Sequence, residues 1–249
     1  MTVHHDGLTV DWLGYATLRV AGEDATVYFD PGRYGVLDGT WTPGSDRQAG
    51  GHPEPQDYRP RDGDVVFVTH VDHYDPDGIR RVASEDATLV VFEGLDVHDT
   101  DRTDERPADL EYDLVEVGME EDLLVADLPV WTVPAYNEPD GPNVDADGTP
   151  VHPKGYGCGF VVSVDGTTVF WPGDSDALEG HEELDVSLFC PSISQSFTMD
   201  RHSAADLAAA MKPDLVLPIH YNTFDALEAD DEAFAADVAS RSVPVVLDR

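Results

Sequence analysis

Short apolar runs, separated by glycine, proline and acidic residues, follow one another along most of the chain. Runs of four to eight residues that are rich in valine, phenylalanine and threonine are typical of β-strands. The runs predict strands at 8–13, 17–20, 25–29, 65–69, 88–92, 114–117, 123–133, 160–164, 167–171 and 215–219. Asp165-Gly166 lies between two of these runs and predicts a hairpin turn.

Helical patterns are confined to three segments. Residues 200–211 are rich in alanine and are followed by Lys212-Pro213, which predicts the best-defined helix. Residues 230–240 predict a second helix with two apolar residues on one face, and residues 77–83 predict a short one. The short helix lies between two predicted strands, so the pattern indicates a strand, helix, strand unit.

Length favours a single domain. A chain of 249 residues can bury a substantial core, and no change of composition divides it, so we expect one domain over residues 1–249. Residues 41–64 are rich in glycine, proline and charge and show no periodicity. They predict a long loop, and loops of that length often cover active sites.

The charge balance is extreme, with 51 Asp and Glu against 14 Lys and Arg and a formal net charge of -37. Such a polyanion repels phosphate backbones, which argues against nucleic acid as a partner. Its self-repulsion destabilises the compact state in ordinary salt, whereas molar salt shortens the Debye length to about 3 Å. We therefore expect a halophilic protein from a salt-rich cytoplasm. The 41% of hydrophobic residues argues against disorder.

The remaining compositional signals concern compartment and redox state. Cys158 and Cys190 each sit beside apolar residues, so we expect two buried thiols rather than a disulfide framework. The first thirty residues contain no basic segment followed by an apolar one, and no stretch approaches the roughly 18 apolar residues of a membrane span. These features predict a soluble, cytoplasmic protein without a membrane partner.

Three predicted strands run directly into residues of metal-ligand type. One leads into the segment 70–75, and the others lead into Asp174 and His220. Function often gathers just past strand ends, so side chains from distant strands can converge on one cation. Nitrogen and oxygen ligands suit Zn²⁺, or Mn²⁺ or Fe²⁺ where carboxylates dominate. The candidate ligands are His70, Asp72, His73, Asp75, Asp174 and His220.

Other polar residues flank these positions. We expect Asn137, His152, Lys154 and Asn222 to contact substrate and Tyr221 to donate a hydrogen bond to a developing oxyanion. Because the chain has only two lysines, Lys154 either holds an anionic substrate group or simply pairs with a carboxylate. The histidines in polar segments are expected at the surface, namely His4, His5, His52, His98, His181 and His202.

Five motifs in their order along the chain resemble the metallo-β-lactamase-fold hydrolases. They are Thr69-His70 with Asp72-His73-Tyr74-Asp75, Val133-Pro134-Ala135-Tyr136-Asn137, His152-Pro153-Lys154-Gly155, Gly173-Asp174-Ser175-Asp176 and Pro218-Ile219-His220-Tyr221-Asn222. The chain is most similar to the ascorbate-6-phosphate-lactonase-like branch, which also shares Trp12-Leu13-Gly14, Phe29-Asp30-Pro31 and Phe197-Thr198-Met199-Asp200. The resemblance covers nearly the whole chain.

The resemblance implies a four-layer αββα sandwich, with a one- or two-metal site at one edge of two sheets. Hydroxide bound there would attack an ester, lactone, amide or phosphoester of a small molecule. By this resemblance, His70 matches the first histidine of the His-x-His-x-Asp-His signature, Asp174 the aspartate that bridges two metals, and His220 a late histidine ligand. It also implies a homo-oligomer, because relatives often associate.

The signature is incomplete in this chain. Without a gap, its second histidine falls on Asp72, its aspartate on Tyr74 and its last histidine on Asp75. With a two-residue deletion, Asp72-His73 matches its Asp-His and the second histidine is missing. Asn137 stands where many relatives carry a histidine, for which His152 is the substitute.

Two functions therefore remain open. The first is a metal-dependent hydrolase in which Asp72 or Asp75 acts as base or ligand, with Asp77 or Asp176 orienting a ligand histidine. The second is a metal-binding but catalytically degenerate member of the fold, serving as a scaffold or sensor. The incomplete signature keeps the second function open, because fold membership alone does not fix an activity.

Overall fold

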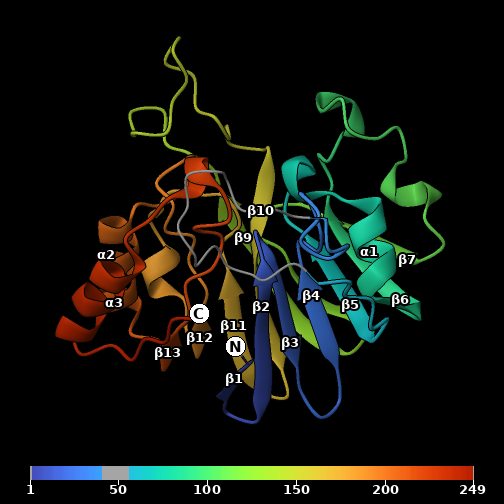
Figure 1. Ribbon diagram of the computed structural model, residues 1–249, viewed down its shortest axis with the longest axis horizontal. Coiled ribbons are helices and arrows are strands. Elements are labelled where there is room, and N and C mark those ends of the chain that lie inside the picture. Colours follow the sequence, from blue (N-terminus) through green and yellow to red (C-terminus); the bar gives the residue numbers. More distant parts are fainter. Residues whose placement is uncertain (1, 41–55, 249) are drawn as a thin grey trace.

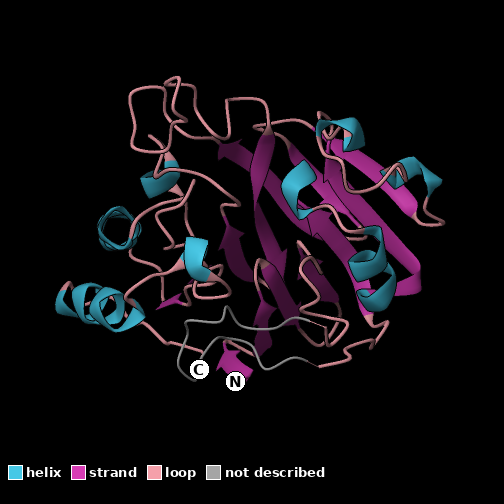
Figure 2. Cartoon of the chain, turned by 45° about the horizontal axis from the view of Figure 1, so that its top comes forward, coloured by secondary structure: helices cyan, strands magenta, loops and turns pink. Residues whose placement is uncertain are grey.

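Two β-sheets face each other in the computed structural model, which describes residues 2–40 and 56–248 (Figure 1, Figure 2). The first sheet has the strand order β1-β2-β3-β4-β5-β6-β7 and the second the order β13-β12-β11-β10-β9-β8. The first comprises β1 (Thr2–His5), β2 (Leu8–Gly14), β3 (Thr17–Ala21), β4 (Thr26–Phe29), β5 (Gly63–Val68), β6 (Ala83–Phe92) and β7 (Asp113–Val117). The second comprises β8 (Asp122–Val125), β9 (Leu128–Ala135), β10 (Gly157–Val164), β11 (Thr167–Trp171), β12 (Leu188–Phe189) and β13 (Leu215–Val216).

Helices flank the pair of sheets on opposite sides. The helix α1 (Pro76–Val82) lies beside β5 and β6, whereas α2 (Arg201–Met211) and α3 (Asp231–Ser240) pack together at the other side (Figure 1). Short 3₁₀ turns lie at Val71–His73, Val97–Asp99, Pro107–Asp109, His181–Glu183 and Asp225–Leu227. The predicted mixed α/β class, with the layers of an αββα sandwich, is confirmed.

Buried side chains from both sheets form one contiguous hydrophobic cluster. Phe67 on β5 shows the contact between layers, because its ring lies 5.1 Å from that of Phe29 in its own sheet and 4.9 Å from that of Phe160 in the other. Burying a side chain of this size contributes about 1.5–3 kcal/mol. These ring contacts therefore help to fix the packing of one sheet on the other.

Parallel pairing brings the ligand-bearing strand ends to one edge. Strands β4 to β7 pair in parallel in the first sheet, and so do β11, β12 and β13 in the second. An antiparallel bridge between His70 and Gly157 joins the two sheets at that edge. The segments after β4, β5, β11 and β13 therefore meet where the sheets come together.

Most predicted elements are present, with differences in detail. The expected strand 123–133 is a hairpin of β8 and β9 that turns at Ala126-Asp127, where both residues have positive φ (47° and 67°). The last strand is shorter than expected, and β1 and β12 were not expected. The predicted loop 41–64 overlaps β5 at Gly63 and Asp64, and its residues 41–55 lie outside the described residues.

The expected buried thiols are confirmed, since Cys158 and Cys190 are both buried and free. The surface position predicted for His181 was wrong, because its side chain is buried and its Nε2 hydrogen bonds the Pro134 carbonyl at 2.9 Å. His52 lies outside the described residues. None of the helices within the described residues is long and apolar enough to cross a membrane.

Candidate metal centre

Three buried side chains converge at the edge where the sheets meet. His73 follows β5, Asp174 follows β11 and His220 follows β13. Oδ1 of Asp174 lies 3.6 Å from His73 Nε2 and 3.4 Å from His220 Nε2. The two imidazole Nε2 atoms are themselves 3.1 Å apart. All three groups thus turn potential metal-ligating atoms toward one point.

A hydrogen-bond relay orients the histidines that follow β5. Asp30, buried at the end of β4, accepts from the backbone N–H of Thr69 (2.8 Å), its hydroxyl (2.8 Å) and the Trp171 indole (2.7 Å). His73 Nδ1 lies 2.8 Å from the same carboxylate, and His70 Nδ1 lies 2.9 Å from the Thr69 hydroxyl. A carboxylate only accepts, so His73 donates from Nδ1 and keeps a lone pair on Nε2. The hydroxyl, which donates to Asp30, accepts from His70 in the same way.

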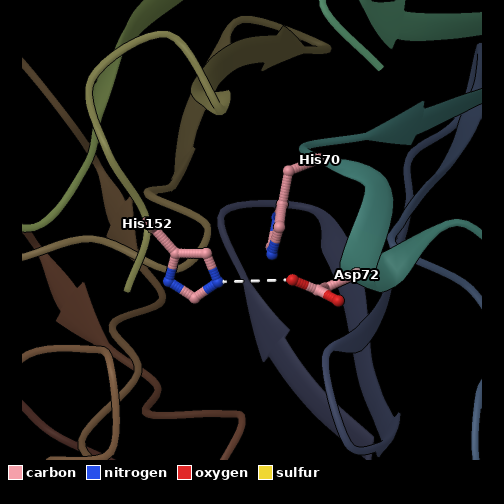
Figure 3. A group of neighbouring side chains, drawn as sticks. All are labelled: His70, Asp72 and His152. Carbon is pink, nitrogen blue, oxygen red and sulfur yellow. Dashed lines mark ion pairs between the residues drawn. The ribbon is translucent and has the colours of Figure 1, made fainter. Parts of the chain in front are cut away.

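A second group adjoins the first. Figure 3 shows His70, Asp72 and His152 pointing toward one another, with Asp72 Oδ2 3.6 Å from His152 Nε2. The ligand-type atoms of His70, Asp72 and His152 lie close enough to hold one ion, and so do those of His70, His73 and Asp174. His70 Nε2 is 3.9 Å from Asp174 Oδ2. The two groups therefore share His70 and form one continuous centre.

Asn137 braces the segment that carries His152. Its side-chain oxygen accepts from the His152 backbone N–H at 3.0 Å, and its backbone N–H donates to the His152 carbonyl at 2.8 Å. Its amide nitrogen donates to Asp176 Oδ1 (3.3 Å) and the Phe197 carbonyl (2.9 Å). The amide is thus engaged in holding the loop, and His152 occupies the centre.

Other predicted site residues lie elsewhere. The Asp75 carboxylate caps α1, accepting from the backbone N–H groups of Asp77 and Gly78, and also accepts from that of Arg33. The structure therefore does not bring Asp75 into the cluster of ligand-type side chains. Asp77 is exposed and Asp176 holds the Asn137 loop, so the orienting role expected of them belongs to Asp30.

The remaining candidates lie around this centre. Tyr221 is buried, with its ring 4.7 Å from that of Trp12, and its catalytic role stays a prediction. The Asn222 side chain exchanges two hydrogen bonds with the backbone of Ala229. Lys154 is exposed and its ammonium lies 5.6 Å from the Tyr136 ring centroid. Substrate contact by Asn137, His152, Lys154 and Asn222 also stays a prediction.

Burial dominates the electrostatics of the centre. It lowers the pKa of His70, His73 and His220 well below the ordinary value, so these imidazoles are neutral at pH 7. It raises the pKa of Asp174 to about 7. Burial also tends to raise the pKa of the Asp72 carboxyl. His152, His70 and Arg102 outweigh this effect and lower the pKa, so the carboxyl stays ionised.

These residues fit a divalent cation. His70 Nε2 and Asp174 Oδ1 are buried and have no hydrogen-bond partner among the described residues. Neutral imidazoles and an ionised carboxylate are the forms in which these groups bind Zn²⁺ and similar metals. An unpartnered buried polar atom costs roughly 1–3 kcal/mol, and a cation between these atoms would offset that cost.

Comparison with known proteins agrees with this geometry. The model of the family described as "Beta-lactamase superfamily domain" matches residues 9–220. The chain belongs to that family. A UPF0173 metal-dependent hydrolase from Methanopyrus kandleri is 28% identical over 246 residues, which cover 96% of this chain and 94% of that protein.

Two further similarities agree with the family. The match to a UPF0173 metal-dependent hydrolase from Natranaerobius thermophilus is 34% identical over 94 residues and spans 35% of this chain, but only 41% of that protein. The structure of Igni18, a metallo hydrolase from Ignicoccus hospitalis, is similar with a TM-score of 0.66 at 18% identity, covering 97% of this chain and 95% of that one. This last likeness shows the fold.

Sequence reasoning missed the residues that hold the ligands in place. Asp30 belongs to the motif Phe29-Asp30-Pro31, and its position directly after a strand is the available signal for its role. Arg102 and Tyr156 carry no such signal, although both bind the Asp72 carboxylate, Arg102 at Oδ1 and Tyr156 at Oδ2 (3.0 Å). Their contacts join segments 30 and 84 residues apart, which no local pattern reveals.

Gly157→Ala should disturb the metal centre, because Gly157 pairs with His70 where the two sheets meet. A Cβ at Gly157 would lie 2.7 Å from both the His70 Cβ and the Thr69 carbonyl oxygen, so the β5 end must shift. We expect a loss of about 1–3 kcal/mol in the free energy of unfolding, together with weaker metal binding. Denaturant titration and metal titration measure the two effects. Gly118→Ala, where a Cβ would meet only the ends of the Glu121 and Glu93 side chains at 3.0 and 3.3 Å, is the control for adding a methyl group. Equal metal affinity in both variants would contradict the predicted disturbance of the centre.

Proposed function

We propose that this protein is a hydrolase that depends on a divalent metal. The observation that carries the proposal is the convergence on one buried point of His73 Nε2, His220 Nε2 and Asp174 Oδ1, which lie 3.1–3.6 Å apart. The relative from Methanopyrus kandleri, which this chain matches over nearly its whole length, is named a metal-dependent hydrolase, and this name supports the proposal. The adjoining Asp72 and His152 supply ligand atoms on the other side of His70.

The metal would be Zn²⁺, one or two ions, with Mn²⁺ or Fe²⁺ as alternatives. Imidazole nitrogens and carboxylate oxygens suit all three. Bound there, a divalent cation supplies Lewis-acid polarisation of the substrate and activates water near neutral pH. His73, Asp174 and His220 would hold it on one side and His70, Asp72 and His152 on the other. Asp72, ionised and held by Arg102, is either a ligand or the acceptor of the water's proton.

The proposed substrate is a small molecule with an ester, lactone or phosphoester bond. Support comes from the resemblance to the lactonase-like branch and from the enclosed centre between two sheets. The net charge of -37 disfavours nucleic acid as a partner and supports a halophilic protein working in a salt-rich cytoplasm. We further propose a homo-oligomer, which the resemblance to the fold implies.

Removing the metal is expected to abolish hydrolysis reversibly. Protein purified in high salt would be assayed on ester, lactone and phosphodiester reporters, before and after a chelator and after Zn²⁺ or Mn²⁺ is restored. The proposal predicts that at least one reporter is cleaved, that the chelator reduces the rate at least about a hundredfold, and that metal restores it. Turnover that survives complete removal of metal would contradict the proposal. Stoichiometric metal without turnover on a broad panel would favour the degenerate scaffold or sensor instead.

A further inference from the structure

An aromatic wall stands beside the metal centre. It consists of Tyr15, Tyr34 and Phe224, whose rings contact one another with centroids 4.9 to 5.9 Å apart. Tyr15 is buried and its centroid lies 5.2 Å from that of His73 and 4.5 Å from that of His220. Tyr34 is 50% exposed, so the wall leads from the buried histidines to the surface.

Arg33 lies at the rim of this wall. Its guanidinium carbon is 4.7 Å from the centroid of the Tyr34 ring. Its Nε is buried and has no hydrogen-bond partner among the described residues. Arg19 Nε is likewise unpartnered, but Arg19, Arg81 and Arg102 each bind a carboxylate through another nitrogen. In a chain with 51 acidic residues, a half-buried guanidinium that pairs with no carboxylate among the described residues is a candidate for binding an anion.

The backbone around Arg33 is held in a costly conformation. Asp30, Arg33 and Tyr34 all have positive φ (46°, 67° and 51°), which is uncommon for residues other than glycine. The same short loop places Asp30 behind His73 and anchors the Arg33 backbone N–H to Asp75. The loop thus ties the orientation of a ligand histidine to the position of the guanidinium.

We propose that Arg33 and the aromatic wall bind the substrate, and that the substrate is a small molecule with an anionic phosphate or carboxylate group beside an apolar part. This inference rests on the proposed function, since it places the substrate at the same centre. The guanidinium donates bidentate hydrogen bonds to the anionic oxygens, and the rings of Tyr34 and Phe224 pack against the apolar part of the substrate. The site therefore assigns anion recognition to Arg33 rather than to Lys154.

Binding of phenyl phosphate and benzoate, measured by calorimetry on metal-loaded protein, tests the assignment. Wild type is compared with Arg33→Gln, Arg33→Lys and Lys154→Gln, and Arg106→Gln, an exposed arginine paired with Asp109, is the control. We expect Arg33→Gln to weaken binding of at least one probe about tenfold or more, Arg33→Lys to retain part of it, and the other two to match wild type. Whichever probe shows the loss identifies the anionic group.

Metal content, thermal unfolding and reporter hydrolysis, measured on the same samples, distinguish failure of this inference from failure of the proposed function. Unchanged affinity for both probes in folded, metal-loaded Arg33→Gln would overturn the inference, as would a tenfold loss in Lys154→Gln alone. Wild type that takes up no metal would instead overturn the proposed function. If the metal-free protein binds phenyl phosphate or benzoate and only Arg33→Gln loses this binding, an anion site at Arg33 is still supported.

Discussion

Replacing Asp174 by alanine is expected to reduce metal-dependent turnover about a thousandfold, which corresponds to about 4 kcal/mol of transition-state stabilisation. Asp174 has one carboxylate oxygen toward His73 and His220 and the other toward His70, so its loss opens both sides of the centre. Steady-state rates on a cleaved reporter measure the effect. Asp147→Ala, at an exposed loop position, is the matched control and should retain the wild-type rate.

The same variant separates catalysis from folding. Burial raises the pKa of Asp174 to about 7, so in the metal-free protein the folded state binds a proton that the unfolded state has released above about pH 4. The contribution of this carboxyl to the free energy of unfolding therefore falls as pH rises from about 4 to 7. Asp174→Ala lacks that contribution and should fold at least as well as metal-free wild type at pH 7. Turnover within tenfold of wild type would show that Asp174 is not a ligand.

Replacing Asp30 by asparagine is expected to weaken metal binding about 10- to 100-fold without removing any ligand. The carboxylate accepts from the Thr69 backbone and hydroxyl, the Trp171 indole and His73 Nδ1, whereas an amide offers one oxygen and an N–H₂ group. At least one donor would face another donor, so the His73 ring loses its fixed orientation. Metal titration against a competing chelator measures the affinity.

Asp30→Asn should also lower the free energy of unfolding by roughly 1–3 kcal/mol, because a buried donor is left unsatisfied. The affinity measurement must therefore be made well below the unfolding midpoint, with Asp147→Asn as the exposed control. A destabilised variant that still binds metal with wild-type affinity would mean that Asp30 only supports the fold. Weaker binding by the folded variant would assign it the orienting role.

The arrangement of strands was predictable where local patterns were strong. Alternation and β-branched runs located β2 to β5, and the alanine-rich segment with its closing Lys212-Pro213 located α2. The hairpin between β8 and β9 escaped because Ala126-Asp127 adopts positive φ without glycine or asparagine, the usual turn residues. The two-residue strand β12 depends on its parallel neighbours β11 and β13, which the local sequence does not show.

The candidate site was predictable to the extent that ligands directly follow strands. His70, His73, Asp174 and His220 come together as the strand ends suggested. Asp75 did not join them, and Asp75-Pro76 at the start of α1 carried the capping signal that explains why, since proline suits the first helical position and aspartate the cap. Asp30 and Arg102 act through contacts across sheets and loops, so only the folded chain reveals them.

The most direct test is elemental analysis of the protein purified in high salt without added metal, alongside Asp174→Ala and His220→Ala. We expect zinc, manganese or iron at one or two ions per chain in the wild type, and loss of that metal in both variants while they remain folded. Wild-type protein that carries no metal and takes up none on titration would contradict the metal centre, and the proposed hydrolase function would fall with it.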